Sequence, residues 1–263
     1  MSGRFVVANG LRVHCALEGP ADAPVVVFCH GLLGTLDMWE AQASALARRY
    51  RVLRYDNRGH GRTEVTPPPY DVGDLARDAV GLLDALSIDR APFVGCSLGG
   101  MIGQALGADH GARLASLVLV GSRSVMPPVS MWEERIRIAR SQGIAPLLPT
   151  MLDRWFTPAY RASHPDAVEA VARGVLATPV DGFVGACMAI RDMDHTSLLA
   201  RIRVPTLVAY ADEDPGVPAD DARYTRSAIP GARLHAFAGA RHLFTIERAD
   251  AFTPVLLDWL SRH

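Results

Sequence analysis

Short apolar runs alternate with segments of helical periodicity along most of this chain, and this alternation restricts its fold more than any other feature. The run at 24–29 is apolar throughout, as expected of a central strand that is covered on both faces. Similar runs follow at 51–55, 93–96 and 117–120, and the segments between them favour helices. This order predicts parallel strands joined by right-handed helical crossovers.

Helices are predicted at 39–49, 71–86 and 98–107, between these strands. In the second of them, Asp71 is placed to cap the N-terminus. The apolar residues of this helix recur at spacings of three and four, so they form one stripe that packs on a sheet. They are Leu75, Ala79, Leu82, Leu83 and Leu86.

The N-terminal part of the chain has two strand-like segments, at 4–7 and 11–17, on either side of Asn9-Gly10. This dipeptide is the strongest short signal for a β-hairpin. We therefore expect a mostly parallel, eight-stranded sheet that begins antiparallel and has helices on both faces.

The segment 1–9 has too short an apolar run for a signal peptide or a spanning helix, which favours a soluble, cytoplasmic protein.

The alternation lapses between 125 and 199. This stretch is rich in helix formers, Trp, Met, Arg and Pro, and it lacks any run as apolar as the earlier strands. We predict that 125–199 is a helical cap, or lid, inserted into an α/β core formed by 1–124 and 200–263.

Strands and helices resume after this stretch. A strand is expected at 206–210, a helix near 220–228 and a strand at 233–238, and a last helix closes the chain. Pro254 is expected near the first turn of that last helix, where a backbone N–H has little or no partner within the helix. The apolar residues that share one face of it are Phe252, Val255, Leu256, Trp259 and Leu260.

The charge balance argues against large anionic partners. Lys and Arg number 27 against 28 for Asp and Glu, so the sequence offers no basic surface for nucleic acid and no polybasic membrane anchor. The four cysteines form no C-x-x-C pair and lie mostly in apolar runs, which fits reduced thiols and argues against a structural zinc site. We expect a small-molecule substrate, no metal, no cofactor, and either a monomer or a homo-oligomer.

The segment Gly95-Cys96-Ser97-Leu98-Gly99 matches G-x-S-x-G between an apolar strand and a predicted helix. A sharp strand-to-helix turn crowds the backbone, so the flanking residues must be small. The turn holds the serine hydroxyl at the C-terminal edge of the sheet, beside a helix N-terminus. We predict that Ser97 is a nucleophile; a chance Gly/Ser turn is the alternative.

A serine nucleophile needs an imidazole that removes its proton during attack. In enzymes with this motif the partners follow in the order Ser, acid, His. Of the histidines after Ser97, His242 follows the last strand and precedes the last helix, at the sheet edge where Ser97 emerges. We predict His242 as the base. The other candidates lie in the cap, inside a strand, after a helix or at the terminus: His110, His164, His195, His235 and His263.

The imidazole needs a carboxylate that fixes its tautomer and stabilises the imidazolium. Asp212, Glu213 and Asp214 come directly after the predicted strand at 206–210. We select Asp214, because the rigid turn at 215–218 can aim it inward. Asp212 is the second choice, since an Asp in a turn often bonds its own backbone.

The tetrahedral intermediate of acyl transfer needs N–H donors that already point at its oxyanion. Leu98 follows the nucleophile at a helix N-terminus, and Leu32 follows His30-Gly31 at the end of the strand at 24–29. We predict that these two amides form the oxyanion hole and that His30 shapes the loop. The segment 56–61, D-N-R-G-H-G, does not match a phosphate loop and is a weak metal ligand set, so we interpret it as a structural turn.

Taken together, the H-G, D-N-R-G-H-G, G-C-S-L-G-G and G-A-R-H segments and the late Asp resemble the α/β-hydrolase superfamily over most of the chain. Segments of the predicted cap, at 132–136, 154–158 and 189–194, are similar to the corresponding stretches of 3-oxoadipate enol-lactonase of the β-ketoadipate pathway. Leu33-Gly34-Thr35 and Met38-Trp39 also resemble that family.

This resemblance implies a substrate that carries a free carboxylate, and hence a cation or N–H donors in the cap. Trp132 and Arg135 lie three residues apart and share a helix face. A guanidinium holds a carboxylate by two parallel hydrogen bonds, and the indole N–H donates one more. An exposed Arg and a core Trp are the alternative interpretation.

The expected reaction is attack by Ser97 on a lactone carbonyl, ring opening to an acyl-enzyme, and hydrolysis by water that His242 activates. A broad-specificity carboxylesterase or another lactonase is the alternative within enzymes. A non-catalytic ligand receptor on the same fold is the alternative outside them. Dehalogenase and epoxide hydrolase chemistry is disfavoured, because those relatives place Asp where this chain has Ser97.

Overall fold

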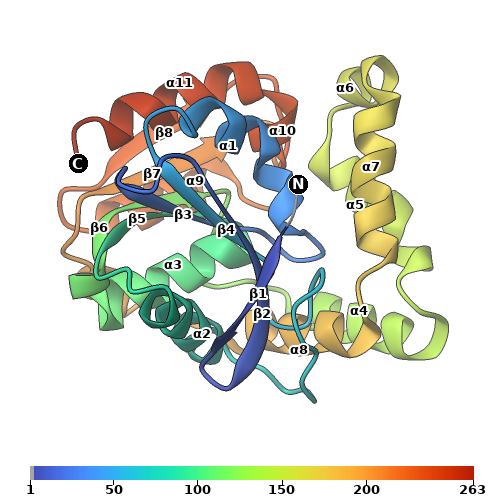
Figure 1. Ribbon diagram of the computed structural model, residues 1–263. Coiled ribbons are helices and arrows are strands. Elements are labelled where there is room, and N and C mark those ends of the chain that lie inside the picture. Colours follow the sequence, from blue (N-terminus) through green and yellow to red (C-terminus); the bar gives the residue numbers. More distant parts are fainter. Residues whose placement is uncertain (1–2) are drawn as a thin grey trace.

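The computed structural model describes residues 3–263, so the N-terminal prediction lies outside the described residues where it concerns Met1 and Ser2. A single sheet forms the centre of the molecule, with helices on both faces (Figure 1). Its strands are ordered β1-β2-β4-β3-β5-β6-β7-β8. They are β1 (Arg4–Ala8), β2 (Leu11–Glu18), β3 (Val25–Cys29), β4 (Arg51–Tyr55), β5 (Ala91–Cys96), β6 (Leu114–Val120), β7 (Thr206–Ala211) and β8 (Arg233–Phe237).

The sheet is antiparallel only at its N-terminal edge. Strand β1 pairs with β2 in antiparallel register, and β2 pairs with β4 in the same way. Asn9 and Gly10 at the β1–β2 turn both have positive φ, 50° and 74°, as a tight hairpin turn requires. The pairs from β3 onward are parallel, which confirms the mostly parallel eight-stranded sheet.

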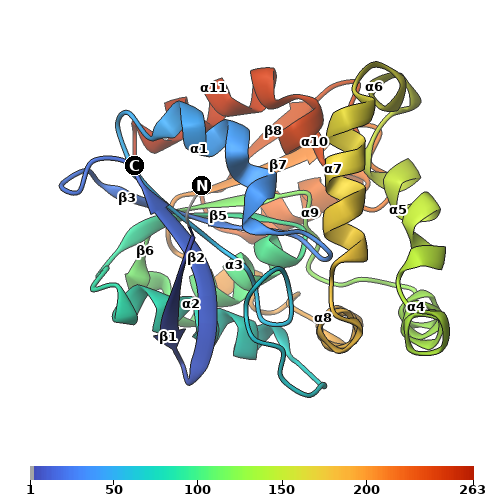
Figure 2. The same ribbon diagram turned by 45° about the vertical axis from the view of Figure 1, so that its right-hand side comes forward.

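Helices cover the two faces in pairs. Helix α1 packs against α11 on one face, and α2 packs against α3 on the other (Figures 1 and 2). The Asp71 side chain accepts a hydrogen bond from Asp74 N at 2.7 Å and caps α2, as its position in the sequence predicts. The core helices are α1 (Glu40–Leu46), α2 (Val72–Ala85), α3 (Leu98–Asp109), α9 (Ala219–Ala228), α10 (Phe244–Glu247) and α11 (Ala249–Leu260).

Five further helices lie between β6 and β7. They form a helical insertion, defined here as residues 125–199, that stands to one side of the sheet (Figure 1). An isolated bridge between Val125 and Asp194 and a hydrogen bond from His195 N to Ser124 O (2.8 Å) close its base. Its helices are α4 (Val129–Gln142), α5 (Leu148–Trp155), α6 (Pro158–Ser163), α7 (Pro165–Leu176) and α8 (Val180–Asp192).

Over residues 3–263, no single helix has both the length and the apolar composition to cross a membrane. Helices α7 and α8 meet that test only as a pair, and the pair is bent by 94°.

The position of Pro254 differs from the prediction. Helix α11 begins at Ala249, so Pro254 is its sixth residue and lies inside the helix, not near its first turn. The helix begins early because the chain turns directly from α10 into α11 at Arg248. Proline cannot donate to the carbonyl of Asp250, and this residue is exposed, so water is available to that carbonyl instead.

An aromatic cluster in the core holds the C-terminal end of the sheet. The rings of Phe28 and Trp39 have centroids 5.0 Å apart, and Phe252 continues the cluster from α11. Phe237, the last residue of β8, stacks on Phe244, the first residue of α10, at 5.0 Å. The loop between β8 and α10 is therefore anchored in the core at both ends.

Candidate active site

Ser97 occupies a strained turn between β5 and α3. Its φ and ψ are 53° and −113°, a backbone conformation that residues other than glycine rarely adopt. The turn is fixed from both sides, because Ser97 N donates to Val120 O (2.8 Å) and Met101 N donates to Ser97 O (3.0 Å). The sequence permits this turn because a Cβ on Gly95 would lie 2.1 Å from Gly99 O, so no larger residue fits there.

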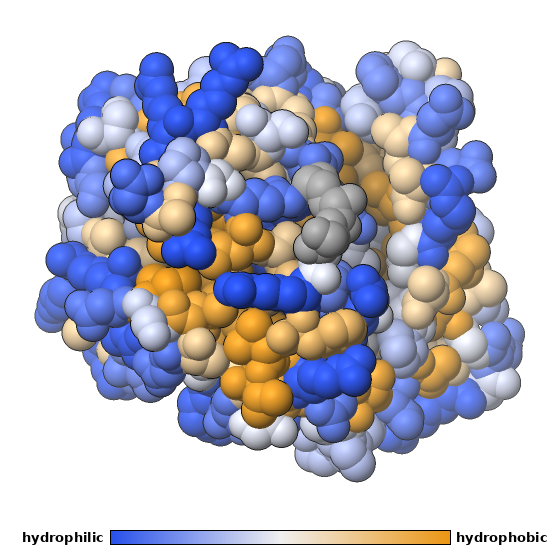
Figure 3. Space-filling model, in the orientation of Figure 1, coloured by the Kyte–Doolittle hydropathy of each residue, from blue (hydrophilic) through white to orange (hydrophobic). Residues whose placement is uncertain are grey.

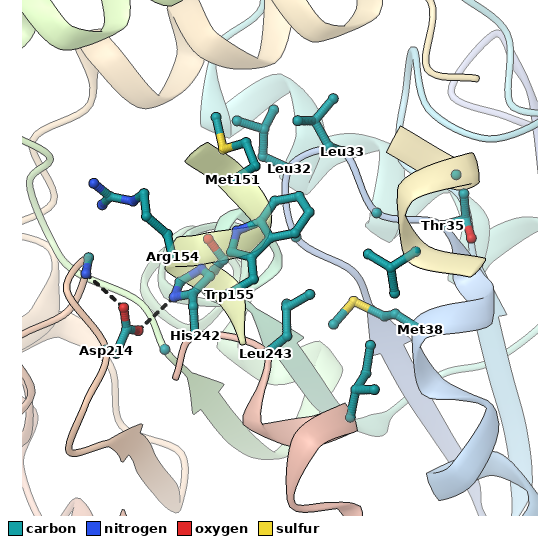
Figure 4. Close-up of a pocket in the computed structure, with 18 of the residues that line it drawn as sticks. Leu32, Leu33, Thr35, Met38, Met151, Arg154, Trp155, Asp214, His242 and Leu243 are labelled. Carbon is teal, nitrogen blue, oxygen red and sulfur yellow. Dashed lines mark hydrogen bonds and ion pairs between the residues drawn. The ribbon is translucent and has the colours of Figure 1, made fainter. Parts of the chain in front are cut away.

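A carboxylate and an imidazole meet at the ends of the next two strands. Nδ1 of His242, in the loop after β8, lies 2.6 Å from Oδ2 of Asp214, in the loop after β7 (Figure 4). The other oxygen of Asp214 accepts from Gly216 N at 2.7 Å. Asp212, the second choice from the sequence, instead accepts from Gly239 N at 2.8 Å and braces the backbone.

The electrostatics of this pair favour an ionised Asp214. Burial raises the pKa of its carboxyl group, but the charge and hydrogen bond of His242 and the N–H groups of Gly216 and Val217 outweigh burial. The pKa of Asp214 is therefore lowered from its usual value. Because an ionised carboxylate only accepts hydrogen bonds, Nδ1 of His242 carries the proton and Nε2 is left as the basic nitrogen.

Ser97 and His242 line the same cavity. Within residues 3–263 the Ser97 hydroxyl makes no hydrogen bond to His242. Such contacts are often long without substrate and tighten in the enzyme–substrate complex.

The two amides predicted as an oxyanion hole are free to bind. No hydrogen bond within the described chain uses the N–H of Leu32 or of Leu98. Leu98 is the first residue of α3, where backbone N–H groups have no partner in the helix. Gly31 lets this loop lie close to the nucleophile, because a Cβ there would lie only 3.1 Å from Ser97 Cβ.

His30 belongs to the scaffold of this loop. Its Nδ1 donates to Gly31 O at 2.7 Å, and its Nε2 accepts from Asn57 N at 2.9 Å. Burial lowers the pKa of His30, so the ring is neutral and serves as one donor and one acceptor. This arrangement fits the structural role expected from the sequence.

The D-N-R-G-H-G segment supports the same loop through a buried carboxylate. Asp56 accepts from Leu36 N (2.8 Å) and from Arg62 N (2.9 Å), and His14 Nδ1 lies 2.7 Å from it. Arg58 forms a two-pronged pair with Asp78 at 2.6 and 2.8 Å. These bonds are those of a structural turn.

The cavity over Ser97 has a volume of about 730 Å³ and is formed by the core and the helical insertion together. Most of its lining is apolar, and Figure 4 shows these side chains converging beside His242. They include Leu33, Met38, Met151, Trp155, Leu243 and Ile246.

Three arginines of the helical insertion line this cavity, and one of them, Arg173, is exposed and paired with Glu169 at 2.8 Å. Arg135 comes from α4 and Arg154 from α5, and both are half-buried in the cavity wall. Among the described residues, neither has an ion pair or a hydrogen bond. Burial and the charge of Arg154 lower the pKa of Arg135 to about 10. Arg135 and Arg154 are thus two cations in the cavity wall that repel each other.

The structure corrects the role expected of Trp132. This residue lines the cavity, but its indole N–H donates to Met126 O at 3.0 Å, so it is not free to hold a carboxylate. The bond forms because Met126 lies in the segment that leads into α4. Trp132 instead lies under Arg135, whose guanidinium carbon is 4.6 Å from the ring centroid.

Arg154 and Trp155 are cavity residues that the sequence does not single out. The only signal for them is their place in the segment 154–158, which is similar to a stretch of 3-oxoadipate enol-lactonase. Whether these two side chains point into the cavity depends on how α5 is placed over the sheet. The local periodicity of the sequence does not determine this placement.

Across residues 3–263, no group of three or more His, Cys, Asp or Glu side chains is placed to hold a metal ion.

The strand-to-helix serine, the strand-end carboxylate and the strand-end imidazole lie on the fold of an α/β hydrolase-type enzyme. A sequence profile for the α/β hydrolase fold matches residues 24–249, and the chain belongs to this family. Its relatives include 3-oxoadipate enol-lactonase 2 of Acinetobacter baylyi, which is 30% identical over 247 residues. The alignment covers 94% of this chain and 92% of that protein.

Two further relatives point to hydrolases. The putative carbamate hydrolase RutD of Variovorax paradoxus is 32% identical over 258 residues, 96% of this chain and 97% of its own. The crystal structure of the enol-lactonase from Burkholderia xenovorans LB400 superposes with a TM-score of 0.96 and 35% identity, over 98% of this chain and 100% of that one. These relationships confirm the resemblance inferred from the sequence.

Proposed function

We propose that this protein hydrolyses a small lactone or ester that carries a carboxylate, with 3-oxoadipate enol-lactone as the first candidate substrate. The observation that carries the proposal is the pair Arg135 and Arg154, two half-buried cations without an anionic partner in the wall of the cavity that contains Ser97. A bound carboxylate would relieve their repulsion. The relatives named as 3-oxoadipate enol-lactonases support this substrate.

In the proposed reaction, Ser97 Oγ attacks the lactone carbonyl carbon while Nε2 of His242 takes the hydroxyl proton. The carbonyl oxygen becomes an oxyanion that accepts from the N–H groups of Leu32 and Leu98. The ring C–O bond then breaks, and His242 returns the proton to the leaving oxygen. An acyl group remains on Ser97.

Water completes the cycle. His242 takes a proton from water as the water oxygen attacks the acyl carbonyl, and the bond to Ser97 Oγ breaks as that oxygen regains the proton. Asp214 stabilises the imidazolium in both halves of the reaction. The product of an anionic lactone carries two carboxylates, and no cofactor takes part.

Two other functions use the same residues. A broad-specificity carboxylesterase, or a lactonase for neutral substrates, is the second candidate, because most of the cavity lining is apolar. A non-catalytic receptor is disfavoured by the backbone of Ser97. A residue at φ 53° and ψ −113° stores strain, and here that strain holds a serine hydroxyl in the cavity that His242 also lines, an arrangement that nucleophilic attack needs and ligand binding alone does not.

The test compares the enol-lactone with its neutral methyl ester, using the parent protein, Ser97→Ala and Arg135→Gln. The proposal expects hydrolysis of the enol-lactone by the parent with a higher kcat/KM than for the methyl ester, and a raised KM of Arg135→Gln for the enol-lactone only. If Ser97→Ala stays within about tenfold of the parent, the serine mechanism is wrong. If the parent prefers the methyl ester, the enzyme is a carboxylesterase or neutral lactonase.

A further inference from the structure

A buried carboxylate outside the proposed catalytic residues connects the core to the helical insertion. Glu247 is the last residue of α10 and is only 8% exposed. One of its oxygens accepts from Thr157 N at 3.0 Å and also from the Thr157 hydroxyl. The other oxygen accepts from Arg241 N at 2.9 Å. Thus one carboxylate binds two segments that are 84 positions apart in the sequence, at 157 and 241.

Two other bonds lie along the same seam. Leu243 N donates to Trp155 O at 3.1 Å, and the Arg241 guanidinium donates to Asp153 O. Most of these contacts join residues 153–157, at the end of α5, to residues 241–247, in the loop after β8 and in α10; the bond from Arg241 N to Glu247 ties the core side together. The seam, defined as residues 153–157 and 241–247, is therefore a continuous strip of hydrogen bonds centred on Glu247.

Each side of the seam carries a residue of the proposed site. Arg154 and Trp155 lie within the strip from α5 and line the cavity, and His242 lies within the strip from the core. The backbone on either side of His242 is bound to this seam, through Arg241 N and Leu243 N. A shift of the seam would therefore move the imidazole and the guanidinium relative to each other.

We propose that Glu247 is a positioning residue that sets His242 and the carboxylate-binding arginine Arg154 at a fixed separation. This inference rests on the proposed function for the roles of His242 and Arg154. Catalysis is sensitive to such placement, since an error of about 1 Å can cost about 100-fold in rate.

The chemistry of the side chain makes the role testable. Glu247 needs two acceptor oxygens, because N–H groups face it from both segments. In Glu247→Gln one oxygen becomes an NH2 group that faces a donor, so one of the two attachments is lost. Thr157→Val removes the hydroxyl that donates to Glu247 and that also accepts from Tyr160 N at the start of α6, and Thr157→Ser restores both bonds.

The activity test uses two aryl esters that differ in charge, the 4-nitrophenyl esters of succinate and of monomethyl succinate. For Glu247→Gln we expect kcat to fall by about 10- to 100-fold on both esters, because His242 shifts. For Thr157→Val we expect KM for the anionic ester to rise by about tenfold while kcat for the neutral ester stays within about threefold. Thr157→Ser should recover the parental KM. Glu134→Gln, which alters an exposed pair in the same insertion, is the matched control and should change nothing.

Hydrogen exchange followed by mass spectrometry tests the link without activity. In Glu247→Gln the amides of both 153–157 and 241–247 should exchange faster, while those of α2 stay as in the parent. Faster exchange everywhere, or in only one strip, overturns the proposal, as does a parental kcat on both esters. If the parent shows no Ser97-dependent hydrolysis but the two strips still loosen together, the proposed function fails and the positioning link stands.

Discussion

Nδ1 of His242 lies 2.6 Å from a carboxylate oxygen of Asp214, and the Asp214 side chain is completely buried. The two residues follow neighbouring parallel strands, β7 and β8, so the fold itself brings them to one edge of the sheet. The bond fixes the imidazole with its basic nitrogen toward the cavity. The buried negative charge of Asp214 can thereby stabilise the imidazolium that His242 forms in the proposed reaction at Ser97.

Asp214→Asn should abolish most activity. An amide in place of the carboxylate favours the wrong imidazole tautomer and gives no charge to stabilise the imidazolium, so we expect kcat to fall about 10⁴-fold. Steady-state kinetics on the preferred ester or lactone measure this loss. Asp212→Asn is the control and should retain at least a tenth of the parental kcat. The reverse ranking would assign the acid to Asp212.

Acid should destabilise the parent partly through Asp214. The pKa of its carboxyl group is lower in the folded protein than the value of about 3.9 in an unfolded chain. The stability that it contributes is therefore complete above about pH 4 and is lost as the pH falls through the lower, folded value. In urea titrations at pH 6 and at pH 3, the free energy of unfolding should fall more for the parent than for Asp214→Asn. Equal losses would show that this carboxyl group is not linked to folding.

Replacing Ser97 by glycine should stabilise the fold relative to alanine. The backbone of Ser97 is in a region that costs about 1–3 kcal/mol for a residue with a Cβ, and glycine avoids this cost. Both variants should be inactive, yet Ser97→Gly should have the higher Tm in calorimetry. A Ser97→Ala protein that melts at or above Ser97→Gly would mean that the turn is not strained.

Arg154→Gln should show a trade between stability and function. Removing one of two repelling, half-buried cations should raise Tm by about 2–4 °C, which corresponds to about 1 kcal/mol in a domain of this size. The same change should raise KM for an anionic substrate by about 10- to 100-fold, the value of a hydrogen bond to a charged group. Arg173→Gln removes an exposed, paired arginine and is the control for Tm. A fall in Tm for Arg154→Gln would argue against an unpaired cation.

Asp56→Asn should weaken the loop that carries the oxyanion amide of Leu32. Asp56 is buried and accepts from two backbone N–H groups and from His14, and an amide nitrogen would face one of these donors. We expect a loss of about 1–3 kcal/mol in the free energy of unfolding, measured by guanidinium denaturation. Asp37→Asn, an exposed change nearby, should have no measurable effect on stability.

Much of this fold could be predicted because it depends on local sequence. The strand at Val25–Cys29 is apolar throughout, Asp71 is a capping residue ahead of α2, and glycines surround Ser97 where only glycines fit. These features are determined within a few residues of one another.

Other features required the tertiary structure. The start of α11, and so the position of Pro254, depends on where α10 ends. The indole of Trp132 could not be assigned a partner from the sequence, because its acceptor is a backbone carbonyl in a preceding loop. The role of Arg154 depends on the position of α5 beside the cavity, which residues far away in the sequence determine.

Several contacts attach the helical insertion to the core. They include the bridge between Val125 and Asp194, the seam at Glu247, and the close approach of Gly182 on α8 to Gly59. One part of the cavity wall is formed by residues of α7 and by the first residues of α1. Asp37 and Ala170, which are exposed, lie at the rim of this part. A groove between the insertion and the core is visible on this side of the surface (Figure 3). A substrate that enters along this groove would pass Asp37 and Ala170 at the rim before it reaches the half-buried Arg135 and Arg154 in the wall.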